Sequence, residues 1–296
     1  MKGLNADSNF LGIEEEALCS YEQSKYVIQS APYEHTSSYL AGSEKGPAAI
    51  LEASHFVEFY DEELDQETFR KGGICTLEAM NFDGKVDADA VDLIEAETTK
   101  LLNDNKFVIS LGAEHTVTFG FVKAHLKKYP NLSVLQIDAH SDLRQAYQGN
   151  PYSHASVMAR VNDLGLKIGQ AGIRAQCIEE AELIKSSANI HTVYAHQVRR
   201  NPNWINELVD HLSDEVYITI DADGLDPAIM PAVGTAEPNG LFWEETMQLL
   251  KTTCERKKVV GFDIVECAPM EGSILSEFTL AKLLYRLMGY ISLSNH

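Results

Sequence analysis

Short apolar runs rich in β-branched residues alternate along this chain with longer amphipathic stretches. Four runs, at 107–111, 133–138, 216–221 and 258–263, are typical of buried strands because they are short and almost continuously apolar. The amphipathic stretches carry apolar residues at helical spacing and predict helices, which cover 86–101, 116–128, 153–164, 203–212, 242–255 and 276–290. This order predicts an α/β fold of three layers, with helices on both faces of a mainly parallel central sheet.

The alternation continues without an internal repeat, a low-complexity tract or a Gly/Ser-rich linker. We therefore expect a single domain over residues 1–296. Two loop-rich stretches, 145–152 and 224–240, each follow a polar motif, and loops in that position usually shape a pocket.

Charge and cysteine content narrow the classes of partner and compartment. The formal net charge is −20 and the basic residues form no patch, which argues against nucleic acid and is compatible with a small cationic substrate. The first sixteen residues lack an apolar signal segment, and no apolar run reaches the roughly 18 residues that span a membrane. The five cysteines are odd in number and never spaced as Cys-x-x-Cys, which fits a reducing compartment, so we expect a cytoplasmic protein.

Each of the four predicted strands leads directly into a motif of acidic or histidine side chains. The motifs are Glu114-His115, Asp138-Ala139-His140-Ser141-Asp142, Asp221-Ala222-Asp223, and Asp263 with Glu266. In open α/β sheets the carboxyl ends of parallel strands share one edge, and ligands bind there. Side chains spread over about 150 positions are therefore expected to converge on one pocket.

The spacing of these residues favours a metal site. If extended geometry continues past the strand, Asp138, His140 and Asp142 project to one side, and Asp221 and Asp223 do the same from a neighbouring strand. With His115 this makes four carboxylates and two imidazoles, enough for two cations. Such an oxygen-rich set favours Mn²⁺ over Zn²⁺. Two such ions would activate a water for attack on an electrophilic carbon.

Structural roles are the alternative for each motif taken singly. Asp-x-His-x-Asp can stabilise a turn after a strand, and His115 with Glu114 can be ordinary residues at a helix start. Asp226 before Pro227 favours a turn rather than a ligand. The four motifs together are much harder to explain in this way.

The chain resembles the ureohydrolase superfamily, the family of arginases and agmatinases, over nearly its whole length. The similar segments are Leu111-Gly112-Ala113-Glu114-His115-Thr116, Asp138-Ala139-His140-Ser141-Asp142, Ile220-Asp221-Ala222-Asp223-Gly224-Leu225-Asp226-Pro227 and Gly261-Phe262-Asp263-Ile264-Val265-Glu266. The resemblance implies an arginase-like fold and a homo-oligomer, since family members are commonly trimers or hexamers.

The resemblance also implies a role for each matching residue. Two Mn²⁺ ions per subunit would be held by His115, Asp138, Asp142 and Asp221 on one side and by Asp138, His140, Asp221 and Asp223 on the other. Asp138 and Asp221 would bridge the ions. Glu266 would hold the guanidinium group of the substrate. Asp142 would also orient the attacking hydroxide, and His154 would transfer a proton.

Two segments depart from the family pattern. The family usually has Gly-Gly-Asp-His-Ser where this chain has Gly112-Ala113-Glu114-His115-Thr116, so the groups that support His115 are expected to differ. The family's Gly-Thr-Pro-x-x-Gly-Gly stretch appears here as Gly234-Thr235-Ala236-Glu237-Pro238-Asn239-Gly240.

The segment around Tyr152-Ser153-His154 looks more like agmatinases than arginases, so the resemblance implies hydrolysis of agmatine to putrescine and urea, a step of polyamine biosynthesis. Asn150 and Tyr152 are predicted to contact the substrate, together with His154 and Glu266. Other guanidino substrates stay open, namely aminopropylagmatine, arginine, guanidinobutyrate, formiminoglutamate and guanidine. A zinc-dependent deacetylase with one metal and a non-catalytic homologue that acts as a binding or regulatory subunit are the remaining alternatives.

Overall fold

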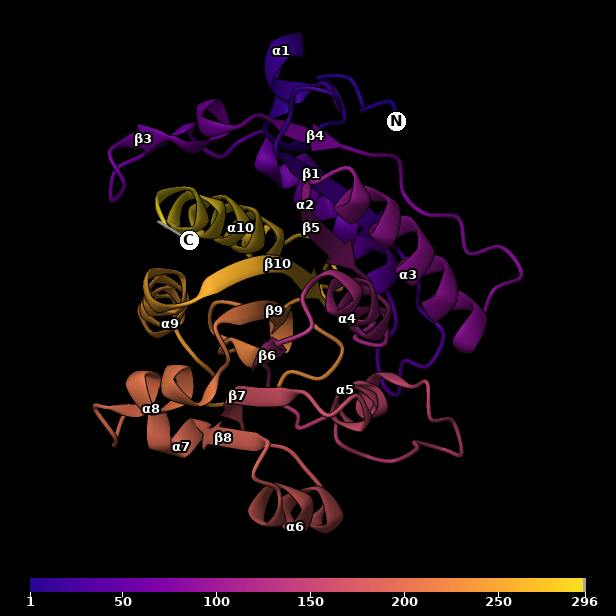
Figure 1. Cartoon of the computed structure of the whole chain (residues 1–296), viewed down its shortest axis with the longest axis vertical. Coiled ribbons are helices and arrows are strands. Elements are labelled where there is room, and N and C mark those ends of the chain that lie inside the picture. The colour runs from indigo at the N-terminus through magenta and orange to yellow at the C-terminus, as the bar shows by residue number, and fades with distance from the viewer. Residues whose placement is uncertain (295–296) are drawn as a thin grey trace.

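The computed structural model describes residues 1–294. Within them, eight parallel strands form one central sheet in the order β4-β1-β5-β10-β9-β6-β7-β8 (Figure 1). The strands are β1 Tyr26–Ala31, β4 Ile74–Thr76, β5 Phe107–Gly112, β6 Leu132–Ile137, β7 Lys167–Ile173, β8 Ile190–Tyr194, β9 Glu215–Asp221 and β10 Lys258–Val265. A separate antiparallel pair joins β2 Tyr60–Asp61 to β3 Gln66–Glu67.

Helices cover both faces of this sheet, with α3, α4 and α5 on one side and α8, α9 and α10 on the other (Figure 1). The helices are α1 Glu16–Cys19, α2 Gly46–Ser54, α3 Ala88–Asn103, α4 Val117–Lys128, α5 Val157–Asp163, α6 Ile178–Ser186, α7 Ala195–Val198, α8 Trp204–His211, α9 Trp243–Arg256 and α10 Leu275–Leu293. No helix within residues 1–294 is long and apolar enough to cross a membrane. The predicted three-layer fold with a parallel sheet is confirmed.

The predicted strands and helices match the structure to within three residues at their ends, apart from the first turn of the helix predicted at 153–164. That turn is a 3-10 turn at His154–Ser156, which precedes α5. Strands β1, β4, β7 and β8 were not predicted from the apolar runs. In β7, two glycines interrupt the run of apolar side chains, and β4 has only three residues. The single domain predicted over residues 1–296 stays a prediction, and its last two residues, 295–296, lie outside the described part.

One row of the buried sheet is polar. Paired positions in seven neighbouring strands, from β1 to β8, carry Gln29, Ser110, Asp263, Thr219, Gln136, Gln170 and Thr192. Gln136 and Thr219 stand two residues before Asp138 and Asp221, and residues i and i+2 of a strand share a face. The row therefore lies one layer beneath the predicted ligands.

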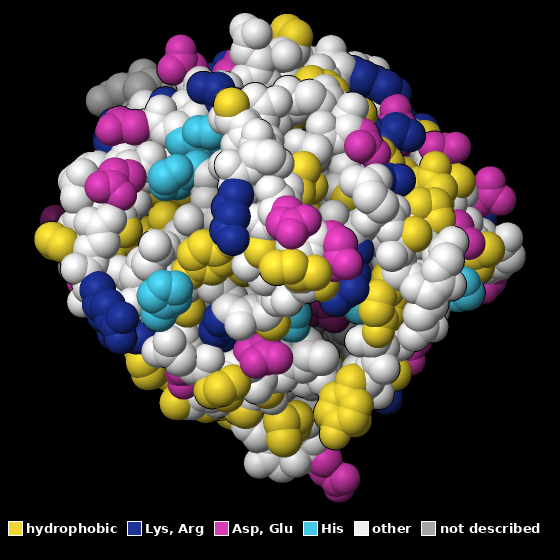
Figure 2. Space-filling view, turned by 90° about the horizontal axis from the view of Figure 1, so that it is seen from below, with side chains coloured by type: hydrophobic (Ala, Val, Ile, Leu, Met, Phe, Trp, Pro, Cys, Tyr) yellow, Lys and Arg dark blue, Asp and Glu magenta, His cyan; other side chains and the backbone are white. Residues whose placement is uncertain are grey.

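The surface seen from the β8 end of the molecule carries mixed charge. Figure 2 shows Lys and Arg side chains dispersed there between acidic and apolar ones.

Helix α4 approaches β10 closely where the buried ring of His125 meets Gly261. The Nδ1 atom of this ring lies 2.8 Å from the carbonyl oxygen of Phe121, and burial lowers the pKa of His125 to about 4, so the ring is neutral. A Cβ atom added at Gly261 would lie 2.3 Å from Nε2 of the ring. Glycine is therefore required at this contact between helix and strand.

We expect Gly261→Ala to lower the free energy of unfolding by about 1 to 3 kcal/mol, because the added methyl group overpacks this contact. Denaturant unfolding measures the change. The same substitution in a His125→Ala background should cost clearly less, because the ring is gone. An equal cost in both backgrounds would show that the contact with His125 is not the cause.

Candidate metal centre

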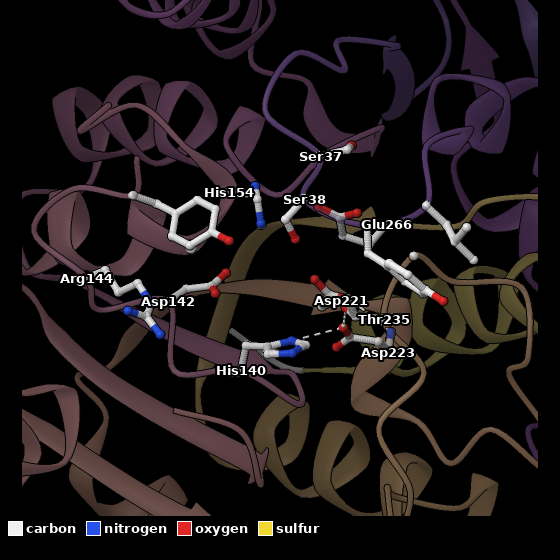
Figure 3. A pocket seen from close by; sticks show the side chains of 15 residues that line it. Ser37, Ser38, His140, Asp142, Arg144, His154, Asp221, Asp223, Thr235 and Glu266 are labelled. Carbon is white, nitrogen blue, oxygen red and sulfur yellow. Dashed lines mark hydrogen bonds and ion pairs between the residues drawn. The ribbon is translucent and has the colours of Figure 1, made fainter. Parts of the chain in front are cut away.

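A cleft of about 180 Å³ opens at the carboxyl ends of the central strands. Its size suits a small molecule. Figure 3 shows the carboxylates of Asp142, Asp221, Asp223 and Glu266 directed into it, from the end of β9 and from the segments that follow β6, β9 and β10. The predicted site residues in its wall are His140, Asp142, His154, Asp221, Asp223 and Glu266. His115 and Asp138 are buried beneath them.

The first group of metal-ligating atoms surrounds His115. Its Nδ1 atom lies 3.1 Å from Asp138 Oδ2, 3.0 Å from Asp142 Oδ2 and 3.3 Å from Asp221 Oδ2. The atom is buried and makes no hydrogen bond with any residue between 1 and 294. The ligand atoms of His115, Asp138 and Asp142 lie within 4.8 Å of one another and could hold a metal ion, and Asp221 approaches the same nitrogen.

The second group surrounds His140, which is partly exposed in the cleft wall. Its Nδ1 atom lies 3.0 Å from Asp223 Oδ2 and 3.6 Å from Asp138 Oδ1. Asp138 thus takes part in both groups, one oxygen toward each histidine. This is the arrangement expected of a carboxylate shared by two cations.

Divalent cations fit this donor set. Nitrogen and oxygen ligands bind such ions at about 2.0 to 2.2 Å, so neighbouring ligand atoms of one ion lie about 3 Å apart, as they do here. Burial, together with the Asp138 carboxylate, raises the pKa of Asp142 to about 7. A cation would relieve this cost of gathering buried negative charge.

The chain reaches Asp142 in a different way from the predicted one. Extended geometry does not continue past β6, which ends at Ile137. The backbone N–H of His140 instead donates to Asp138 Oδ1 at 2.6 Å, and Asp142 has a left-handed φ of 54°. The Asp142 carbonyl accepts the N–H groups of Met158 and Ala159 at the start of α5. A turn that is hydrogen-bonded to the start of α5 therefore brings the side chains of Asp138, His140 and Asp142 together.

Asp221 and Asp223 are likewise joined by a turn. Asp221 ends β9, and a 3-10 turn at Ala222–Gly224 follows, in which the Asp223 N–H donates to Asp221 Oδ1 at 2.8 Å. A Cβ atom at Gly224 would lie 2.7 Å from the backbone nitrogen of Asp138. Glycine therefore lets the two ligand segments approach each other.

A second layer of polar groups, which the sequence analysis missed, holds Asp138. Gln136 Nε2 donates to Asp138 Oδ2 at 2.7 Å, and Gln170 Nε2 donates to Gln136 Oε1 at 2.6 Å. Thr192 Oγ1 donates to Gln170 Oε1 at 2.7 Å. Polar residues inside apolar strand runs were the signal that could have revealed this layer.

The ring of His115 is held from behind through Thr219 and Asp263. Thr219 Oγ1 lies 2.9 Å from His115 Nε2 and donates to Asp263 Oδ1 at 2.7 Å. Because the hydroxyl proton is directed to Asp263, Nε2 donates and Nδ1 keeps its lone pair for a cation. Asp263, which was grouped with Glu266 in the sequence motif, is thus a support of the site.

Glu266 follows β10 and lies in the cleft wall with a left-handed φ of 62°. Its Oε1 atom accepts the backbone N–H of His115 at 2.7 Å. Burial raises the pKa of Glu266 to about 8, although this hydrogen bond lowers it. A bound cationic group would favour the charged carboxylate.

His154 lies in the cleft wall across from Glu266 (Figure 3). Burial lowers the pKa of His154 to about 4, so the ring is neutral near pH 7.

The predicted substrate contacts of Asn150 and Tyr152 find no support in the geometry. The Asn150 amide donates to Asp87 Oδ1, and its oxygen accepts the Tyr152 N–H, so this side chain fastens the loop. Neither residue is among the described residues that line the cleft. Tyr147, Gly234 and Thr235 line the cleft from the two loop-rich stretches that were expected to shape a pocket. The lining residues that the sequence analysis missed are Ser37, Ser38, Tyr39, Leu40, Arg144 and Ala155.

The chain is similar to known proteins over most of its length. Residues 24–289 match the model of the arginase family. The chain is 43% identical over 284 residues to the N(1)-aminopropylagmatine ureohydrolase of Synechocystis sp., covering 94% of this chain and 92% of that protein. It is 37% identical over 259 residues to the agmatinase of Bacillus cereus, with coverage of 85% and 86%. The solved agmatine ureohydrolase of Thermoplasma volcanium superposes with a TM-score of 0.80 at 33% identity, with coverage of 94% and 93%.

The three-layer fold and the Asp/His cluster at its rim define the class of α/β proteins that can hold metal at the carboxyl ends of a parallel sheet. Within that class, this chain belongs to the arginase family. The predicted ureohydrolase family is thereby confirmed.

Replacing the shared ligand by Asp138→Asn should weaken the binding of both cations, for one of them by at least about 100-fold, because one ion loses its oxygen ligand and the other keeps only a neutral amide oxygen. Metal analysis of the Mn²⁺-loaded, desalted protein measures this. Asp226→Asn is the matched control: Asp226 accepts the N–H groups of Ala228 and Gly240 within its loop, as predicted for a turn, and should leave the metal content unchanged. Wild-type occupancy of both ions in Asp138→Asn would disprove sharing.

Proposed function

We propose that this chain hydrolyses the guanidino group of a decarboxylated, cationic substrate and releases urea. Water adds to the guanidino carbon, the bond from that carbon to the alkyl nitrogen breaks, and an amine leaves. The observation that carries the proposal is the placing of the Glu266 carboxylate beside the two ligand groups in one small cleft. A carboxylate there can pair with a guanidinium and turn its carbon toward the metal ligands.

Agmatine, which would give putrescine, and aminopropylagmatine are the proposed substrates. Relatives named for both compounds are similar to this chain over most of its length. Arginine stays in the test as a substrate because Arg144 lines the cleft. The guanidinium of Arg144 could pair with the α-carboxylate of a bound arginine. The Arg144 side chain lies over the Tyr147 ring and is 4.0 Å from Glu180.

We assign two Mn²⁺ ions to the ligand groups, because the donors are oxygen-rich with two imidazoles. When bound, the ions would supply an activated water at neutral pH. Asp142 is placed to accept a hydrogen bond from that water. His154 would take up a proton and return it to the departing amine, which suits a neutral imidazole.

Assembly into trimers or hexamers and a cytoplasmic location were predicted from the sequence, and both stay predictions.

Urea release by the Mn²⁺-loaded protein tests the proposed function, with agmatine, aminopropylagmatine, arginine, guanidinobutyrate, formiminoglutamate and guanidine as the panel. We expect a kcat/KM for agmatine or aminopropylagmatine at least about tenfold above that for arginine, about 1.4 kcal/mol in transition-state binding. A preference for arginine would overturn the proposed substrate. Bound metal without urea from any compound would favour a non-catalytic role.

Glu266→Gln should lower kcat/KM for the preferred substrate by about 10- to 100-fold, because a hydrogen bond to a charged group contributes about 1.5 to 3 kcal/mol. Metal content should stay at the wild-type level. Steady-state kinetics and metal analysis on the same preparation separate the two effects. Loss of metal in this variant would assign Glu266 to the metal site instead.

A further inference from the structure

The loop between β1 and α2 contacts His154 directly, although the two segments are far apart in the sequence. Thr36 Oγ1 lies 3.0 Å from His154 Nδ1 and accepts the backbone N–H of His154 at 3.1 Å. One hydroxyl group thus contacts both the ring and the backbone of this histidine.

The same hydroxyl is fixed from its other side by Glu114. Thr36 Oγ1 donates to Glu114 Oε1 at 3.2 Å, and Glu114 Oε2 accepts the backbone N–H groups of Thr36 at 2.6 Å and His35 at 2.7 Å. Glu114 is fully buried, so these groups in the loop are its hydrogen-bonding partners in place of water.

A hydroxyl group has one proton to donate and two lone pairs with which to accept. With its proton directed to Glu114, Thr36 Oγ1 can only accept from His154. One lone pair takes the backbone N–H, and the other takes a proton on Nδ1. The ring is thereby held as the tautomer with a proton on Nδ1 and a free lone pair on Nε2.

We propose that Thr36, backed by Glu114, is a positioning residue that fixes the tautomer and orientation of His154, so that Nε2 can accept a proton in the cleft. The proposal rests on the role assigned to His154 under the proposed function. The opposite tautomer would present an N–H on Nε2, which can donate but cannot take up a proton. The Tyr147 ring, edge-on at a centroid distance of 5.6 Å, packs against the imidazole.

The substitution that tests this is Thr36→Val, which keeps the shape of the side chain and removes the hydroxyl. Thr36→Ser keeps the hydroxyl and should behave as the wild type. Thr99→Val is the control for the loss of a threonine hydroxyl elsewhere, since Thr99 donates to the Glu95 carbonyl of its own helix.

The direct readout is the tautomer of His154 in ¹⁵N-labelled protein, from long-range ¹H–¹⁵N spectra. The protein is loaded with Zn²⁺, which is diamagnetic, and the signal is assigned with His154→Asn. Wild type, Thr36→Ser and Thr99→Val should show the proton on Nδ1, and Thr36→Val should show a mixture or the Nε2–H form. A wild-type ring with its proton on Nε2, or an unchanged tautomer in Thr36→Val, would overturn the proposal.

The kinetic readout uses the Mn²⁺-loaded variants and the preferred guanidino substrate. Thr36→Val should lower kcat about tenfold and leave KM within about twofold. The expected loss in kcat is a part of the rate enhancement that general acid–base catalysis supplies. Thr36→Ser should restore kcat. Unchanged kcat in Thr36→Val beside an active wild type would overturn this proposal alone. Absence of urea from the wild type would overturn the proposed function, and the tautomer measurement would still decide the role of Thr36.

Discussion

The structure at the sheet rim depends on keeping four buried aspartates within reach of one another. Asp138, Asp142, Asp221 and Asp223 approach two imidazoles at about 3 Å, and such a concentration of negative charge is costly away from water. Divalent cations would offset the repulsion. Backbone N–H groups that donate to Asp138, Asp221 and Asp223 offset part of it as well. Bound cations would therefore stabilise the folded state at this edge of the sheet.

The polar row beneath the ligands supports them from within the sheet. Gln136 and Thr219 occupy strand positions that an apolar side chain would fill in an ordinary sheet core, and they fix Asp138 and His115. Their outer partners, Gln170 and Asp263, are themselves hydrogen-bonded. The ligands are thus held by rigid strands through two layers, which favours a preformed site over one that assembles around the ion.

The sequence alone was enough to predict the layers and the family, and it named the Asp and His residues that the structure gathers at the sheet rim, because each of these motifs follows a strongly apolar strand. The conformation after β6 could not be predicted in this way. The alternation of side chains in an extended segment led to the expectation that Asp142 lies near the other ligands, but a turn hydrogen-bonded to the start of α5, and not an extended chain, brings it to His115. Asn150 and Tyr152 do not line the cleft, and Asn150 instead stabilises its own loop, which proximity to a motif in the sequence could not reveal. Glu114, noted as a departure from the family pattern, proved to bind the loop that carries Thr36, a contact between distant segments that no local pattern reveals.

The most direct test of the account is anomalous diffraction from crystals of the Mn²⁺-loaded protein. The account predicts two ions about 3.5 to 4 Å apart, with Asp138 and Asp221 each bound to both. A single ion, or two ions that share neither carboxylate, would contradict it.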